Sequence, residues 1–417
     1  MKRYDSYKDS GVKWLGEIPS HWEMERWRYL MKENVLKNSD CSIRLQLQFR
    51  YGDIVRKINQ SEESDVLETI SKYTVVEPDD IMINGLNLNY DFISQRVARV
   101  KEKGVITSAY ISLRPTQIAN SRYYTYFLKS MDAKKMFHGM GTGIRLTLSY
   151  NELKNQFIPK PSIKEQEAIA RYLDSATSKI DEAIDQQQKM IDLLNERKHI
   201  IINKAVTKGL DNIESAKESG IDWVGLVPSN WAVNKLNHYY LFEKGKNAQL
   251  YTREYCGSNP GDYPVYSGQT ENNGVMGLIN SYDYDVDECL FTTTVGAKVM
   301  TPRILKGKFS LSQNCLIMRR RKQINNNFVY YFLISMFPHK KALIPSHMQP
   351  SLRVEDMNTY KILVPPIEEQ NKISSFLNNR CSIIDSTIKK CETMISLLQE
   401  RKQIIINEVV TGKVKVS

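Results

Sequence analysis

The sequence lacks the features that would indicate a membrane protein, a secreted protein or a metal centre. In 417 residues no run approaches the about 18 consecutive apolar residues of a membrane helix, and the N-terminal segment has no apolar core of a signal peptide. The six cysteines form no C-x-x-C pair and no zinc spacing, and the six histidines show no H-E-x-x-H pairing. We therefore expect a cytoplasmic protein without a metal site or a membrane contact, whose cysteines are reduced and structural.

Motifs for catalysis and cofactor binding are missing as well. There is no G-x-x-x-x-G-K-[ST] segment to hold ATP phosphates and no strand-borne G-x-G-x-x-G. The Asn/Asp-Pro-Pro-aromatic tetrapeptide of amino-methyltransferases is absent, and the glycine-rich segment 139–143 is more typical of a turn than of a cofactor site. These absences predict a chain that is not an enzyme by itself, and they argue against a self-sufficient methyltransferase.

Acidic residues are absent from Cys289 to Val354, although eleven lysines and arginines fall there and the whole chain carries a net charge of +11. The corresponding part of the first half, Phe92–Asn151, has ten Lys and Arg against only Glu102 and Asp132. Two cationic surfaces, one in each half, suggest a polyanion that is held in two places. The alternative is a solvated basic face without a partner.

A long segment occurs twice: Ile163–Thr207 recurs 204 residues later as Ile367–Thr411, and about half of the paired positions are identical. Each copy has apolar residues at alternating spacings of three and four, which predicts a helix of about 60 Å with one continuous seam. Such a helix needs a partner to cover the seam. The other copy is the nearest candidate. The two seams are Leu173, Thr177, Ile180, Ile184, Gln187, Ile191, Leu194, Lys198 and Ile201, and Leu377, Cys381, Ile384, Ile388, Cys391, Ile395, Leu398, Lys402 and Ile405.

A second repeat precedes each half of the chain. Ser6–Trp22 and Ser215–Trp231 share the frame W-x-G-x-x-P-x-x-W, which contains four of the five tryptophans. Gly and Pro at fixed offsets between aromatic rings indicate a rigid, packed turn. Base stacking by these rings is the alternative, and packing is favoured.

Between these repeats lie two blocks, Arg26–Lys160 and Trp231–Pro366, that share landmarks but little other sequence. Leu148 precedes Pro161 by 13 residues, as Leu352 precedes Pro365, and basic segments Arg99–Gly104 and Arg303–Gly307 are each predicted as a hairpin. The pattern indicates one scaffold used twice with different loops, a way for one fold to bind two different things.

Together these segments resemble the specificity subunit of type I restriction–modification systems. The resemblance rests on the W-x-G-x-x-P-x-x-W frames, on P-x-I-x-E-Q at Pro161–Gln166 and Pro365–Gln370, and on helices that end in L-L-x-E-R-K-x-I-I-I-N at Leu193–Asn203 and Leu397–Asn407. It covers nearly the whole chain. Each piece alone is a weak signal, but the combination is highly specific.

The resemblance implies an α+β fold with two mixed α/β target recognition domains, related by a pseudo-twofold axis and separated by two long antiparallel helices that form a coiled-coil spacer. The expected divisions are 1–160 and 208–366 for the recognition domains, and 163–207 and 367–411 for the spacer helices. It also implies a reader of double-stranded DNA with a bipartite, asymmetric site. Two modification subunits and restriction or motor subunits are the expected partners; S-adenosylmethionine, ATP and Mg belong to those partners, with no cofactor in this chain.

Candidate contact residues follow from the basic and polar loops. Most basic residues would hold phosphates and only some would read bases, and a solvated face is the alternative for each one. The DNA-contact candidates are Arg96, Arg99, Lys101, Lys103 and Arg145 in the first block, and Gln269, Asn272, Asn273, Lys298, Arg303, Lys306 and Lys308 in the second. The partner-contact candidates are Glu196, Arg197, Lys198, Glu400, Arg401 and Lys402, of which the two lysines lie on the seams and could instead fix the helix register.

Two rival functions remain open at this point. One is the recognition subunit of a type IIB-like restriction enzyme, in which methylation and cleavage share a partner. The other is a helical scaffold that binds nucleic acid without regard to sequence.

Overall fold

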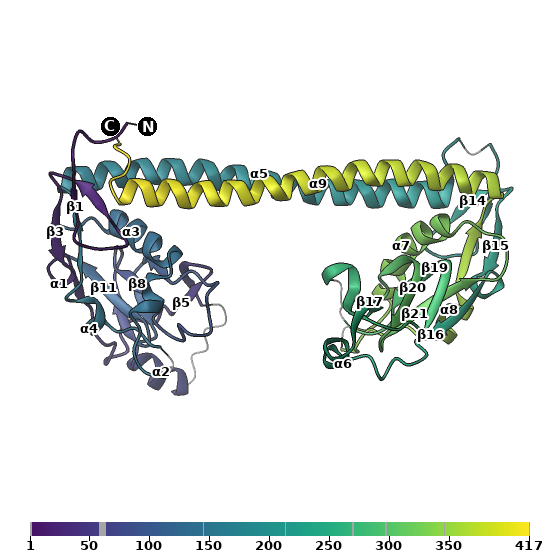
Figure 1. Ribbon diagram of the computed structural model, residues 1–417, viewed down its shortest axis with the longest axis horizontal. Coiled ribbons are helices and arrows are strands. Elements are labelled where there is room, and N and C mark those ends of the chain that lie inside the picture. The colour runs from purple at the N-terminus through teal and green to yellow at the C-terminus, as the bar shows by residue number, and fades with distance from the viewer. Residues whose placement is uncertain are drawn as a thin grey trace. The chain divides into compact units, whose positions relative to one another are not determined.

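The computed structural model describes residues 2–57, 64–144, 146–212, 214–268, 271–296, 298–345 and 347–416. The chain divides into two compact units, which we call unit 1 (Met1–Gln187 with Glu392–Ser417) and unit 2 (Gln188–Cys391). Each unit combines β-sheets with helices, as Figure 1 shows, and the α+β prediction is confirmed.

Unit 1 is built on a four-stranded antiparallel sheet with the strand order β4-β11-β8-β9, and α3 packs against β9. Two-stranded ribbons β1-β2, β3-β12, β5-β6 and β7-β10 surround it. Its elements are β1 (Tyr7–Asp9), β2 (Glu17–Pro19), β3 (Glu23–Arg26), α1 (Trp27–Leu30), β4 (Met31–Glu33), β5 (Leu47–Arg50), β6 (Asp53–Arg56), α2 (Ser64–Ser71), β7 (Thr74–Val76), β8 (Ile81–Ile83), β9 (Val97–Arg99), β10 (Gly104–Ile106), β11 (Ile111–Pro115), α3 (Ser121–Ala133), η1 (Met136–Gly139), α4 (Tyr150–Leu153) and β12 (Phe157–Lys160).

Unit 2 has a six-stranded sheet with the order β16-β21-β19-β20-β17-β18, in which only the β17–β20 pair, among the residues described, is parallel. Helix α7 packs against β19 and β20. The elements of unit 2 are β13 (Ala216–Glu218), β14 (Leu226–Pro228), β15 (Ala232–Lys235), η2 (Leu236–His238), β16 (Tyr240–Lys244), α6 (Arg253–Ser258), β17 (Pro260–Tyr266), η3 (Glu271–Gly274), β18 (Val275–Ile279), β19 (Tyr284–Thr293), β20 (Pro302–Leu311), β21 (Cys315–Arg320), α7 (Asn326–Ala342), α8 (Val354–Thr359) and β22 (Lys361–Val364).

The tryptophan frame is a packing element in both units. Trp22 and Trp231 are fully buried. The Trp14 ring lies 5.8 Å from the Phe127 ring of α3, and the Trp223 ring lies 5.6 Å from the Phe332 ring of α7. Because the same ring pair forms at the same place in each unit, the packing interpretation of the frame is confirmed.

The glutamine of P-x-I-x-E-Q is also structural. The Gln166 side chain is fully buried, accepts the Asn120 N–H at 2.7 Å and donates to the Pro161 carbonyl at 2.9 Å. In unit 2 Gln370 accepts the Asn325 N–H at 2.9 Å and donates to the Pro365 carbonyl at 2.8 Å. Asn120 and Asn325 are the N-caps of α3 and α7, so one amide in each unit joins the start of a long helix to the start of the helix beside it.

The two long helices are α5 (Ile163–Lys208) and α9 (Ile367–Val410), within one residue of the expected ends. In unit 1 the first part of α5 packs antiparallel to the last part of α9, and Ile169 and Leu173 share a core with Ile406 and Val410. In unit 2 the last part of α5 packs on the first part of α9, where Ile202 and Val206 share a core with Ile373 and Leu377. Every predicted seam position is buried or half-buried.

Both chain ends belong to unit 1, close to β1 in Figure 1. The Lys415 N–H donates to the Lys2 carbonyl at 2.9 Å, and Lys2 and Lys415 form an isolated antiparallel bridge. After α9, Gly412 takes a left-handed backbone (φ 73°) and lies so close to Pro19 that a Cβ would meet the proline ring at 2.4 Å. The C-terminal segment is therefore packed onto the first tryptophan frame.

One sequence expectation about the fold is wrong. Arg99–Gly104 and Arg303–Gly307 are each predicted as a hairpin, and neither is one. Arg99–Gly104 connects β9 to β10, but β9 pairs with β8 and β10 with β7. Arg303–Gly307 lies inside β20, which pairs with β19 along most of its length. Gly307 has a left-handed backbone (φ 75°) and lies opposite Val286 at a shift in the strand register. This glycine therefore marks a bulge and not a turn.

Candidate nucleic-acid interface

Two loops occupy equivalent positions in the units. In unit 1 the Leu148 N–H donates to the Gly85 carbonyl at 2.9 Å, just after β8; in unit 2 the Leu352 N–H donates to the Thr294 carbonyl at 2.8 Å, just after β19. Leu148 and Leu352 are the landmarks that the sequence placed at matching distances from the prolines. The loops that begin at these two hydrogen bonds, 84–95 in unit 1 and 294–301 in unit 2, differ from each other in length and sequence.

The loop of unit 1 is shaped by Arg96. This side chain is 1% exposed, and its guanidinium donates to the carbonyls of Asn84 at 3.0 Å, Leu86 at 2.8 Å and Asp91 at 2.6 Å. Its backbone N–H donates at 2.7 Å to Asp132 of α3, and burial raises the pKa of that carboxyl group. Both Nη groups of Arg96, a predicted DNA contact, donate inside the protein, and its buried Nε has no hydrogen-bond partner in the described ranges. This burial argues against a direct contact between Arg96 and DNA.

Three other basic candidates of unit 1 are paired with carboxylates. Arg99 bonds to Asp79 at 2.6 Å, Lys101 to Asp53 at 2.5 Å and Lys103 to Glu77 at 2.8 Å. None of these three acids lies in the window Phe92–Asn151 that suggested a cationic surface. The fold therefore neutralises much of this predicted surface, although the three cations remain at least partly exposed.

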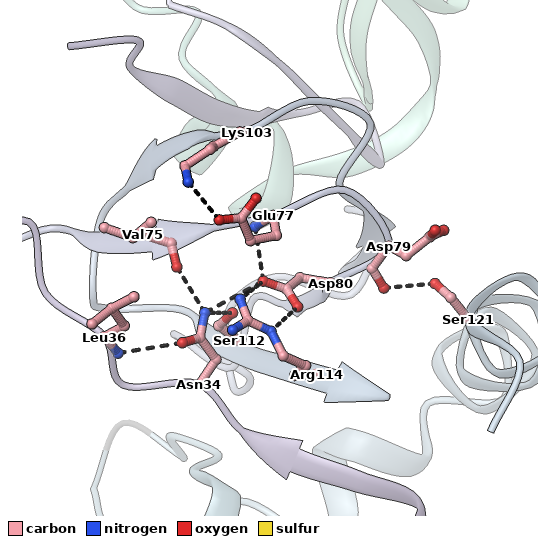
Figure 2. A network of polar contacts seen from close by, with 10 residues as sticks. All are labelled: Asn34, Leu36, Val75, Glu77, Asp79, Asp80, Lys103, Ser112, Arg114 and Ser121. Atoms are coloured by element: carbon pink, nitrogen blue, oxygen red, sulfur yellow. Dashed lines mark hydrogen bonds and ion pairs between the residues drawn. The ribbon is translucent and has the colours of Figure 1, made fainter. Parts of the chain in front are cut away.

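Beside the Lys103–Glu77 pair lies a polar network centred on buried Asp80, shown in Figure 2. Asp80 is 2% exposed and accepts two hydrogen bonds from the Arg114 guanidinium, at 2.8 and 2.7 Å, together with the Glu77 N–H at 2.9 Å. The Asn34 amide donates to Asp80 and to the Ser112 hydroxyl. The Asp80 carboxylate raises the pKa of Arg114, and the paired charges hold edge strand β4, β11 and the turn before β8 together.

In unit 2 Glu288 precedes the buried pair Cys289-Leu290, as Asp80 precedes the buried pair Ile81-Met82 in unit 1. Glu288 accepts from Lys306 at 3.1 Å and from the Asn326 amide at 2.9 Å, so the ammonium group of Lys306, a DNA-contact candidate, is paired within the chain. Lys308 is exposed over the Tyr282 ring at 4.7 Å, and its hydrogen bond with Tyr282 raises its pKa.

The remaining DNA-contact candidates fall in three groups. Lys298 is exposed in the loop 294–301, and Arg303 is half-buried on β20. Asn272 and Asn273 are exposed in η3 with left-handed φ values of 47° and 55°. Arg145 and Gln269 lie outside the residues that the structure describes.

A groove of about 920 Å³ in unit 2 was not anticipated from the sequence. It is lined by Lys244–Leu250, Thr294–Val295, Ser312–Cys315, Ser351–Arg353 and Glu355. These segments follow β16, follow β19, join β20 to β21 and precede α8. Gln249, Gln313 and Asn314 bring amide groups to it, but they are far apart in the sequence and form no motif that would have drawn attention.

Two ion pairs tie the long helices together. In unit 2 the Lys198 ammonium lies 2.7 Å from Asp385, and in unit 1 the Lys402 ammonium lies 2.6 Å from Asp181. The two pairs are equivalent within the repeat, because each joins the lysine of one copy to the aspartate of the other. The repeat offset of 204 residues separates Asp181 from Asp385 and Lys198 from Lys402. This placement matches the register role that the sequence left open for the lysines.

Next to these pairs each helix exposes an apolar stripe. In unit 2 it consists of Met190, Leu193 and Ile200 with Arg197 between them, and unit 1 has the repeat copies Met394, Leu397, Ile404 and Arg401. The six apolar side chains are between 47% and 61% exposed. Glu196 and Glu400 are exposed beside the stripes. Large apolar side chains at spacings of three and four on an uncovered helix face are typical of a protein–protein contact.

Other chemistry is scarce in the part of the chain that the structure describes. There, no group of three or more His, Cys, Asp or Glu is placed to hold a metal ion, and no helix is long and apolar enough to cross a membrane. All six cysteines are free, and burial raises the pKa of Cys289 and Cys315 to about 12, so these thiols stay protonated.

Comparison with known proteins gives the class. A family model described as the type I restriction modification DNA specificity domain matches residues 59–191 and 228–394, and the chain belongs to this family. The resemblance drawn from the repeated motifs is thereby confirmed.

Particular relatives extend over the full length. The chain is 24% identical to the putative type I restriction enzyme MjaX specificity subunit of Methanocaldococcus jannaschii, with 98% of each chain covered. It is also 24% identical to the MjaVIII specificity subunit of the same organism, covering 98% of this chain and 97% of that one. A chain solved in a study of complex assembly and conformational transition of the type I R-M system has the same fold, with a TM-score of 0.71 at 13% identity, covering 95% of this chain and 99% of that one.

Proposed function

We propose that this chain is the DNA sequence-recognition subunit of a type I restriction–modification complex and reads a bipartite, asymmetric site. The observation that carries the proposal is the repeated scaffold with unlike loops. The tryptophan frame, the buried glutamine and the backbone hydrogen bond of Leu148 or Leu352 occur in both units. The loops 84–95 and 294–301, in contrast, differ in length and sequence. Two different readers on one scaffold fit two different half-sites.

The charge arrangement supports sequence reading over general adhesion to nucleic acid. A scaffold that held only phosphates would gain from uncompensated cations. In unit 1, however, Arg99, Lys101 and Lys103 are each paired with a carboxylate. In the proposed complex these three, with Lys298, Arg303 and Lys308 of unit 2, exchange or extend their contacts to phosphates, and exposed Asn272 and Asn273 face the duplex.

The exposed helix stripes are the proposed contacts with modification subunits. Each stripe carries Arg and Glu beside Met, Leu and Ile, and the same set occurs once in each unit. Two equivalent stripes fit two copies of one partner, with Glu196 and Arg197 at one copy and Glu400 and Arg401 at the other. In this assembly the chain has no catalytic role; S-adenosylmethionine, ATP and Mg bind to the partner subunits.

The test is methylome sequencing of the host with and without this gene. We expect deletion to remove one split motif with methylated adenine in its two halves, and a plasmid copy to restore it. An unchanged methylome, or binding by the reconstituted complex that shows no sequence preference, would contradict the proposal. A type IIB-like enzyme is distinguished by cleavage, because there the modification partner itself cuts on both sides of the site.

A further inference from the structure

The groove of unit 2 has a rigid frame. Its segments are joined by backbone hydrogen bonds, from the Thr294 N–H to the Asn314 carbonyl at 2.9 Å and from the Leu352 N–H to the Thr294 carbonyl at 2.8 Å. The Ser312 N–H adds a bond of 2.8 Å to the Tyr266 carbonyl of β17. Loops from different parts of the unit are thus held at fixed positions around the groove before any ligand arrives.

The wall formed by Lys244–Leu250 is fixed as well. The Asn247 amide donates to the Asp283 carboxylate at 2.7 Å, and the Lys246 ammonium donates to the Asp283 carbonyl at 3.0 Å. Gly245 lies directly on the end of β20, where a Cβ would come within 2.4 Å of the Leu311 carbonyl oxygen. Two of the polar side chains of this wall are therefore used to hold the loop, and the exposed Gln249 is not among them.

Three amide side chains remain available in the groove. Gln249, Gln313 and Asn314 are exposed, and within the described part of the chain their side chains make no hydrogen bond. Asn314 has a left-handed backbone (φ 65°), which turns the short β20–β21 connection. A side-chain amide offers a donor and an acceptor side by side, the pattern that matches N6 and N7 of adenine in the major groove.

The charged groups of the groove fit a duplex. Lys244 and Arg353 line it and are exposed, so they can hold phosphates at its rim, and Arg353 can also reach the guanine edge. Glu355 adds one carboxylate, which repels phosphate and accepts from the amino group of cytosine.

We propose that this groove is the base-reading surface of unit 2, and that Gln249 and Gln313 select adenine in one half of the DNA site. The inference rests on the proposed function and deepens it, because it names the residues and the base for one of the two readers.

The test uses the complete complex, reconstituted from this chain and its modification partner. Gln249→Leu/Gln313→Leu removes two amides and keeps side-chain size, and Gln323→Leu, an exposed position outside the groove, is the matched control. Affinities are measured by competition between the methylated motif's duplex and duplexes with one base pair changed in either half. We expect the double variant to lose at least tenfold of its discrimination at adenines of one half only. Affinity for duplex without the site should stay within twofold, and Gln323→Leu should match the wild type.

The outcomes separate the two proposals. Discrimination in both halves that survives the double variant would overturn the groove proposal alone. So would an equal loss of specific and non-specific affinity, because the groove would then hold only phosphates. A wild-type complex without any preference would instead refute the proposed function. Should the double variant fail to fold, the single variants Gln249→Leu and Gln313→Leu are measured in its place; discrimination retained in both overturns the proposal, and a loss in one half supports it.

Discussion

Arg96 shows how a basic residue in a recognition unit can act through the backbone. Its guanidinium bonds to three carbonyls of the loop 84–95. The loop has no strand or helix of its own, so these bonds define where its exposed residues point. In the sequence alone, Arg96 is a basic residue near a variable loop and cannot be told from a residue that binds phosphate. Only the three carbonyls around its guanidinium show its structural role.

We expect Arg96→Met to lower the free energy of unfolding of unit 1 by roughly 2–4 kcal/mol, because hydrogen bonds to a charged donor contribute about 1.5–3 kcal/mol each and partly compensate the cost of burying the charge. Arg99→Met is the matched control. Its pair with Asp79 is partly exposed, and such pairs contribute at most about 1 kcal/mol. Urea unfolding of both variants measures the difference, and equal losses would show that Arg96 has no special role.

Residue-level charge was the least predictable property. Counting Lys and Arg in a window suggested a cationic surface in the first block, but Lys101 bonds to Asp53, 48 positions away, and Arg99 to Asp79, 20 positions away. Ion pairs form between segments that are far apart in the sequence, so a count of charges within one segment misses the acidic partners. The same limit hid the groove amides, since Gln249 and Gln313 line one groove only when the six-stranded sheet has formed.

At the scale of elements, the repeated motifs predicted both long helices and the packed tryptophan frames, because period and repetition are local properties of the sequence. They did not predict what Gln166 and Gln370 do, as the bonded N–H groups belong to Asn120 and Asn325, 46 and 45 positions away. They also gave no warning that Arg303–Gly307 continues a strand, because a bulge at Gly307 has the same sequence signal as a turn.

The exposed stripes lead to a prediction about partner number. If the proposed two modification subunits bind at the stripes, Leu193→Glu in unit 2 should reduce their number to one, and Leu397→Glu in unit 1 should do the same. The reason is that a carboxylate in an apolar contact costs about 2 kcal/mol or more. The double variant should bind none. Native mass spectrometry of the purified complex reads the stoichiometry directly.

The controls for this prediction place the same charge elsewhere on the same helices. Asn195→Glu and Gln399→Glu are exposed positions outside the stripes and occupy equivalent repeat positions. Both should keep two partners. Two partners retained by the double leucine variant would show that the stripes are not the contact.

At the scale of the whole molecule, the two units differ in how the chain builds them. Unit 2 is one continuous stretch, Gln188–Cys391, whereas unit 1 needs Glu392–Ser417 in addition to Met1–Gln187. The C-terminal segment brings Ile406, Val409 and Val410 into the core of unit 1. Full burial of such side chains contributes roughly 1.5–3 kcal/mol each.

We therefore expect the fragment 188–391 to unfold cooperatively by itself, and the fragment 1–187 to require a peptide of residues 392–417. Thermal unfolding followed by circular dichroism, with and without the peptide, measures this. A peptide in which Ile406 and Val410 are replaced by Ser serves as the control and should give little rescue. A fragment 1–187 that is as stable alone as with the peptide would contradict the division.

The bridge between Lys2 and Lys415 has a consequence for gene architecture. Since Lys2 and Lys415 are neighbours within unit 1, a short peptide could join these two segments, and the chain could be opened instead between α5 and β13. Such a circular permutant would be encoded with its two readers in the opposite order and would still make the same contacts within each unit. The fold therefore does not determine the order in which the two units are encoded along the gene.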